Sequence, residues 1–172
     1  GLAVVDENQQ LYFSYMDTNG TFRPLGVVGS GGYHSRSVGL ADFDQDGFLD
    51  IVTAHSAGNQ VIPQFHKGNG DGTFADPVVL PEFAGSGDWA MDMAVGDFDG
   101  DGALDVVVNG NSEQVGFYWG AGDGTFAVAT RAMVSAGRGM DAADFNGDGR
   151  PDIARATYSD GTVRLYLSDG GR

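Results

Sequence analysis

The chain has 172 residues, no cysteine and a formal net charge of −15, and 41% of its residues are hydrophobic. This hydrophobic content is sufficient for a core and excludes a disordered linker. The strongly acidic composition excludes a nucleic-acid-binding role, which needs a basic surface. Apolar runs are far shorter than the ~18 residues of a membrane-spanning helix, so we predict no membrane span.

Short apolar runs separated by glycine occur along the whole sequence, which contains 29 glycines. This pattern is typical of many strands joined by tight turns and predicts an all-β protein. In residues 1–28, runs at 2–5, 11–15 and 24–28 predict three strands. Because no acidic loop precedes them, we interpret this segment as strands two to four of a partial repeat.

An acidic nine-residue motif follows three times, at 42–50, 97–105 and 144–152. Its pattern is Asp-Phe-Asp/Asn-x-Asp-Gly-x-x-Asp, with side-chain oxygens at positions one, three, five and nine. The glycine at position six permits a sharp turn. Such dense oxygen donors, without cysteine or histidine, suit Ca²⁺ better than zinc or copper. We therefore predict one Ca²⁺ in each motif, about three per chain, chiefly to rigidify the loop.

The predicted metal-ligating residues occupy positions one, three, five, seven and nine of each motif. They are Asp42, Asp44, Asp46, Phe48 and Asp50, then Asp97, Asp99, Asp101, Ala103 and Asp105, and finally Asp144, Asn146, Asp148, Arg150 and Asp152. Asn146 is neutral, so the third site is expected to bind more weakly.

An EF-hand begins with a similar motif, but it needs a glutamate at position 12 and a helix on each side. Position 12 is here Thr53, Val108 and Arg155. The flanking runs, such as 37–41 and 49–53, are short and apolar and show no helical period. The motif therefore joins two strands, and the aspartate at position nine closes the cage.

A second motif, Asn/Asp-Gly-Thr-Phe, occurs at 19–22, 71–74 and 123–126, with a spacing of 52 residues. Asn-Gly and Asp-Gly predict two-residue hairpin turns in which both central residues have positive φ. A period of about fifty residues with four short strands is typical of β-propeller blades. We predict about three and a half four-stranded antiparallel blades: a partial blade at 1–28, blades at 29–83 and 84–134, and a partial blade at 135–172.

The two motifs together resemble the FG-GAP/VCBS repeats, which form calcium-bearing blades in integrin alpha-subunit propellers, bacterial surface proteins and fungal lectins. The resemblance covers nearly the whole chain and implies a β-propeller with calcium in a loop of each repeated blade. Asn146 and the missing loop of the first repeat depart from the family pattern. The repeats serve adhesion, sugar binding and enzyme accessory roles, so the resemblance does not identify a ligand.

Propellers typically have four to eight blades. We therefore expect the segment either to belong to a longer chain or to complete a ring with copies of itself, and a small open form is the third alternative.

Candidate ligand-binding residues lie where the inner strands begin. His34 aligns with Trp89 of the next repeat, and both are expected, with Arg36, Arg138 and Asp92, near the mouth of a central channel. His34, His55 and His66 show no spacing typical of a zinc site.

Aromatic residues on the third strands offer a second set of candidates. Strand alternation predicts a core column made of Phe13, Phe65, Phe117 and Leu165. The same alternation places Ser14, His66, Tyr118 and Tyr166 on the opposite face. Tyr118 and Trp89 are thus the candidates for stacking on a sugar ring, whereas Trp119 fits the core.

No catalytic arrangement or phosphate-binding loop is found in the sequence, and most carboxylates are assigned to metal, so we expect no enzyme activity. Calcium loops fill where calcium is millimolar, which favours an extracellular or cell-surface location. We expect a binding or adhesion module with a glycan as first-choice ligand and a protein as second. The alternatives are an accessory or catalytic propeller of a secreted carbohydrate-active enzyme, and a structural self-assembling subunit.

Overall fold

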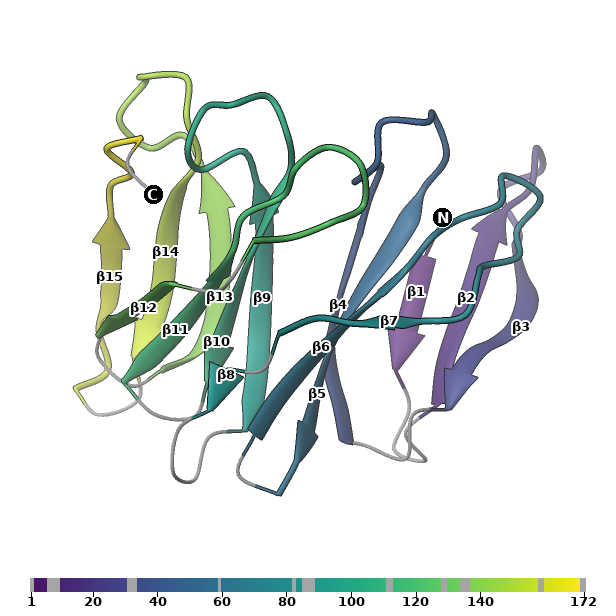
Figure 1. Ribbon diagram of the computed structural model, residues 1–172, viewed down its shortest axis with the longest axis horizontal. Coiled ribbons are helices and arrows are strands. Elements are labelled where there is room, and N and C mark those ends of the chain that lie inside the picture. Colours follow the sequence, from purple (N-terminus) through teal and green to yellow (C-terminus); the bar gives the residue numbers. More distant parts are fainter. Residues whose placement is uncertain are drawn as a thin grey trace.

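The computed structural model describes residues 2–5, 10–30, 34–58, 60–81, 83–84, 89–110, 113–127, 130–133, 137–157 and 160–170. All regular elements in these ranges are β-strands, and they form four antiparallel sheets in chain order (Figure 1). The all-β prediction is therefore confirmed.

Each sheet is one blade. Blade one has the order β1 (Leu2–Val5), β2 (Gln10–Met16), β3 (Phe22–Ser30). Blade two contains β4 (His34–Ala41), β5 (Asp50–Ala57) and β6 (Gln60–His66), with β7 (Val78–Val79) and β8 (Phe83–Ala84) both paired to β6. Blade three contains β9 (Ala90–Gly96), β10 (Asp105–Gly110), β11 (Gln114–Tyr118) and β12 (Thr130–Met133). Blade four contains β13 (Gly137–Ala143), β14 (Asp152–Thr157) and β15 (Val163–Tyr166).

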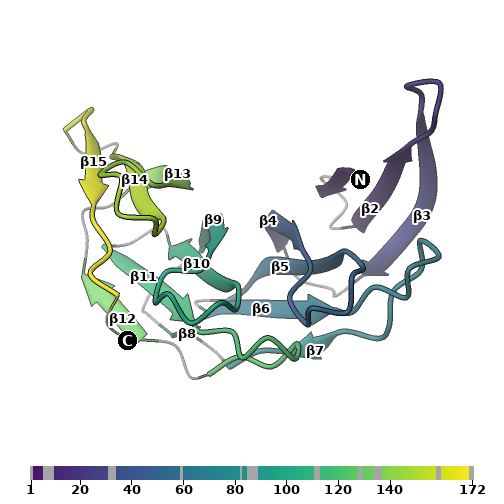
Figure 2. The same cartoon turned by 90° about the horizontal axis from the view of Figure 1, so that it is seen from above.

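The four blades stand side by side in an open arc, as Figure 2 shows from above. Strands β4, β9 and β13 line the inner side, and later strands of each blade lie progressively further out. This in-to-out order of antiparallel strands is the topology of propeller blades.

The apolar cores lie between successive blades rather than inside any one of them. The largest cluster joins blades two and three and includes Phe43, Phe65, Val106 and Tyr118. Strand β10 is buried along its whole length, because blades cover both of its faces. This explains why Val106, Val107 and Val108 follow one another in its sequence instead of alternating with polar residues.

The phenylalanine of each Asp-Gly-Thr-Phe turn locks its blade to the preceding one. Phe74 of blade two packs edge-on against Phe13 of blade one, with ring centroids 5.1 Å apart. Phe126 of blade three packs edge-on against Phe43 and Phe65 of blade two, with ring centroids 5.7 and 5.9 Å apart. The equivalent Phe22 of blade one is 49% exposed.

The turn before these phenylalanines differs from the predicted two-residue hairpin. Gln45 is the only non-glycine residue with positive φ in the described ranges, so Asp71 and Asp123 lack the required conformation. Instead, Oδ1 of Asp71 accepts hydrogen bonds from the backbone N–H of Thr73 (2.9 Å) and from its hydroxyl (2.6 Å). Asp123 and Thr125 form the same pair of bonds. The aspartate therefore closes a wider turn through its side chain.

The predicted core column is confirmed at Phe13 and Phe65, which are buried, and Phe117 packs partly buried against Phe98. Leu165 is an exception, with 55% exposure. It lies on the face that, in blades one to three, is covered by the next blade along the chain. The opposite-face prediction is confirmed at Tyr118, which packs in the cluster between blades two and three, whereas Phe117 packs in the cluster between blades three and four. Tyr118 and the equivalent His66 are both buried, because blades flank both faces of their strands.

Candidate metal centre

Each acidic motif forms the loop from the first to the second strand of a blade, at 42–50, 97–105 and 144–152, here called the first, second and third loops. The glycine at position six has a φ of 91°, 92° and 88° in the three loops, a conformation that favours glycine. The aspartate at position one accepts the N–H of that glycine at 2.9 Å in every loop. The motif thus folds the loop around its own first carboxylate.

The aspartate at position nine joins three parts of a blade. Oδ2 of Asp105 accepts the backbone N–H of Phe98 (2.9 Å), and Oδ1 accepts that of Gly120, just beyond β11 (2.8 Å). Asp50 and Asp152 make the equivalent bonds. A side chain at Gly120 would place its Cβ 2.2 Å from a backbone oxygen. This position therefore needs glycine for the close approach.

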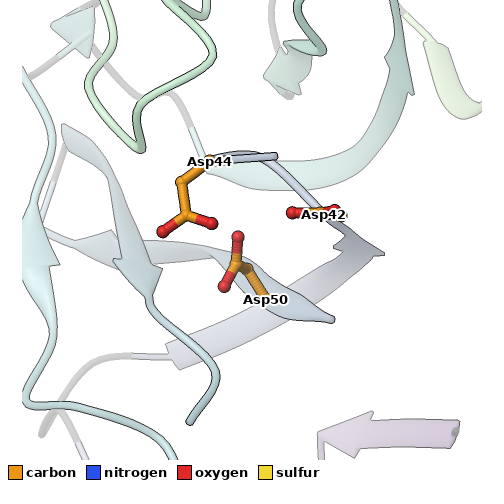
Figure 3. A group of neighbouring side chains, drawn as sticks. All are labelled: Asp42, Asp44 and Asp50. Carbon is orange, nitrogen blue, oxygen red and sulfur yellow. The ribbon is translucent and has the colours of Figure 1, made fainter. Parts of the chain in front are cut away.

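Two loops gather three carboxylates each. Oxygen atoms of Asp42, Asp44 and Asp50 lie within 4.8 Å of one another, and Figure 3 shows Asp44 and Asp50 pointing toward each other. Asp97, Asp99 and Asp105 form the matching triad in the second loop, whose oxygens meet the same limit. Three hard oxygen donors at this separation fit a calcium ion.

Burial raises the pKa of Asp105 to about 6, and the neighbouring Asp99 and Asp101 act in the same direction, whereas hydrogen bonds from Gly120 and Phe98 oppose the rise. Burial also raises the pKa of Asp50. A divalent cation at either triad would favour the ionised carboxylates.

The FG-GAP-like repeat family matches residues 2–53, 54–108 and 97–155, which is most of the chain. The chain belongs to this family. No curated protein sequence matches the chain. FG-GAP repeats are propeller repeats, in agreement with the arc of blades in the structure. In the part of the chain that the structure describes, there is no helix long and apolar enough to cross a membrane.

The third FG-GAP loop differs from the other two. Its aspartates at positions one and nine, Asp144 and Asp152, are exposed and buried, respectively. Asn146 stands at position three, where its amide donates to Asp148 (3.0 Å) and its carbonyl accepts the Asp148 N–H (2.8 Å). The third loop thus presents one carboxylate fewer than each triad.

The position-five aspartates lie outside the two triads. Asp46, Asp101 and Asp148 each accept the N–H of the residue at position seven, at 2.9, 2.8 and 2.9 Å. Asp148 also pairs with the Arg150 guanidinium at 2.9 Å. Ligation by position five and by the position-seven residues Phe48, Ala103 and Arg150 remains a prediction.

The first loop contains Gln45 where the other loops have glycine, and Gln45 has a φ of 59°. Its side-chain amide donates to the carbonyl of Gly102 in the second loop at 3.0 Å. The two calcium-loop candidates of neighbouring blades are therefore in direct contact.

The predicted ligand residues are brought together only in part. The Arg36 guanidinium lies 4.8 Å above the centre of the exposed Trp89 ring, which joins blades two and three. His34 pairs through its backbone with Ser56, and its side chain lies outside the described residues. Tyr118 is fully buried, so the prediction that it stacks on a sugar is wrong.

Asp92 connects the inner strands of three blades. Its Oδ1 accepts the Ser37 hydroxyl of β4 (3.2 Å), and its Oδ2 accepts the Met140 N–H of β13 (3.0 Å). The arrangement holds the inner side of the arc together. Arg138, also predicted near the channel mouth, is exposed on β13.

Two features were missed at the sequence level. Lys67 follows β6 and pairs with Asp44 and Asp46 of the first loop. His55 and His66 meet at the buried hydroxyl of Thr53, at 2.5 and 3.5 Å from their Nε2 atoms. Aligning the ends of the third strands would have revealed the position of Lys67 beside the first loop.

Proposed function

We propose that this protein is a calcium-binding FG-GAP propeller module, in which the ions hold the loops between first and second strands. The observation that carries the proposal is the pair of aspartate triads, each with oxygens within 4.8 Å. Carboxylates so close together repel one another, and bound calcium would neutralise that repulsion and rigidify the loop. The third loop would bind one ion more weakly through Asp144, Asn146 and Asp152.

Calorimetric titration of chelator-treated protein with Ca²⁺, together with melting curves, tests the proposal. We expect at least two bound ions and a rise in the melting temperature, since an ion that binds only the folded state stabilises it. Asp44→Asn and Asp99→Asn should each weaken one site and leave the other. Asp76→Asn, on an exposed surface aspartate, is the matched control and should change neither quantity. Absence of both binding heat and stabilisation would contradict the proposal.

We further propose that the calcium-loaded module is extracellular and non-enzymatic and binds a glycan, with a protein as second choice. The exposed Trp89 supports this, because an indole ring can stack on a sugar ring, and the Arg36 guanidinium over one of its faces can donate hydrogen bonds to the hydroxyl groups of the sugar. A glycan array with wild-type protein and Trp89→Ala tests it. Binding by both proteins, or by neither, would count against this site.

A further inference from the structure

Lys67 is the single lysine of the chain, and it reaches into the first loop. Its backbone is fixed beside the cage, because its carbonyl accepts the Ala75 N–H at 2.8 Å and the next residue, Gly68, donates to Asp50. The side chain extends from this anchor, and Nζ contacts Asp44 of the triad and lies 2.6 Å from Asp46 Oδ2.

The other loops carry no lysine at the aligned position. Lys67 is the first residue after β6, and the first residue after β11 in blade three is Trp119. Its side chain is buried, and its ring stacks on Phe117 with centroids 5.2 Å apart. Beyond β15 the residue is Leu167. At position seven of the second loop, Ala103 also carries no charge. The first and second loops thus have matching carboxylate triads but different charges around them.

We propose that Lys67 is an internal counter-cation of the first loop, which lowers the calcium affinity of this loop below that of the second loop and is displaced when calcium binds. This inference rests on the proposed calcium sites. A lysine ammonium is charged at neutral pH. It occupies carboxylate oxygens that the ion would use, and it repels a divalent cation at the same site. Because the side chain is 43% exposed, solvent and salt screen this repulsion.

Replacement of Lys67 by methionine keeps most of the apolar stem and removes the charge. In the Asp99→Asn background, where the second loop binds more weakly, Lys67→Met should tighten first-loop binding by roughly threefold to tenfold in a calorimetric calcium titration. Lys67→Arg retains the charge and is the matched control, with an expected change of less than about twofold. In the Asp44→Asn background, Lys67→Met should leave second-loop affinity unchanged.

The single lysine also permits a direct readout of the wild-type protein. Reductive methylation with ¹³C-formaldehyde labels only Lys67 and the N-terminal amine, and the label retains the charge. We expect the Lys67 methyl signal to move only after the first equivalent of calcium has bound, because the second loop fills first. The N-terminal methyl signal serves as the internal reference.

Movement of the Lys67 signal with the first equivalent, or an unchanged or weaker affinity in Lys67→Met, would overturn the inference while calcium binding itself stood. The absence of calcium binding in every variant would instead remove the proposed function and this inference with it.

Discussion

At the residue scale, two buried histidines make the stability of the protein depend on pH. Burial lowers the pKa of His55 and of His66 to about 4, and His66 lowers that of His55 further. In the unfolded chain the value is near 6.5. Between these values the unfolded chain binds more protons, so stability is full above pH 6.5 and falls as the pH drops toward 4.

The His66→Gln variant isolates this effect. When the pH falls from 7 to 5, protonation of each histidine in the unfolded chain lowers the unfolding free energy by about 2 kcal/mol. Because the variant has one such histidine fewer, its unfolding free energy should fall by about 2 kcal/mol less than that of the wild type. Urea unfolding in chelator at both pH values measures the difference. Asp105, whose raised pKa acts with the opposite sign, is present in both proteins and cancels. Equal losses in the two proteins would show that His66 does not titrate in this way.

At the element scale, the turns between third and fourth strands stabilise the contact between blades. Phe126 packs against Phe43 and Phe65, whereas Phe22 at the same motif position is 49% exposed. Removing an aromatic side chain from a core costs about 3–5 kcal/mol, and less where burial is partial. We expect Phe126→Ala to lower the unfolding free energy by about 2–4 kcal/mol and Phe22→Ala by less than ~1 kcal/mol, measured by urea unfolding. Similar losses from both would refute the locking role.

The elements also show what the sequence can predict. The acidic loops and the strands beside them were predictable, because the loop residues interact mainly with each other, as the bonds to Asp97 show. The type of turn in the Asp-Gly-Thr-Phe motif was not predictable, because Asp71 closes the turn through its side-chain acceptor and does not adopt a positive φ. The burial of Tyr118 depends on the neighbouring blade, so no local pattern of β11 reveals it. The contact of Lys67 with Asp44 spans 23 residues and follows from the pairing of β5 and β6.

At the scale of the whole molecule, the arc has one apolar face that no blade covers in the described structure. Val163, Leu165 and Leu167 on and beyond β15 are 69%, 55% and 60% exposed. Of these three residues, Leu167 also lines a groove between blades three and four, together with Phe117, Trp119 and other residues of that interface. Exposed apolar side chains on an outer strand favour association with another chain.

We therefore expect the sedimentation coefficient of the wild type to rise with protein concentration, and Leu165→Lys to suppress the rise. The added charge would have to be buried in the contact, which costs several kcal/mol without a partner. Since the side chain is exposed in the single chain, the substitution should change folding stability by less than ~0.5 kcal/mol. Val78→Lys, at an equally exposed valine of blade two, is the matched control and should leave association intact. If Leu165→Lys associates as the wild type does, the contact lies elsewhere on the arc. If the wild type stays monomeric at all concentrations, this face does not bind a second copy.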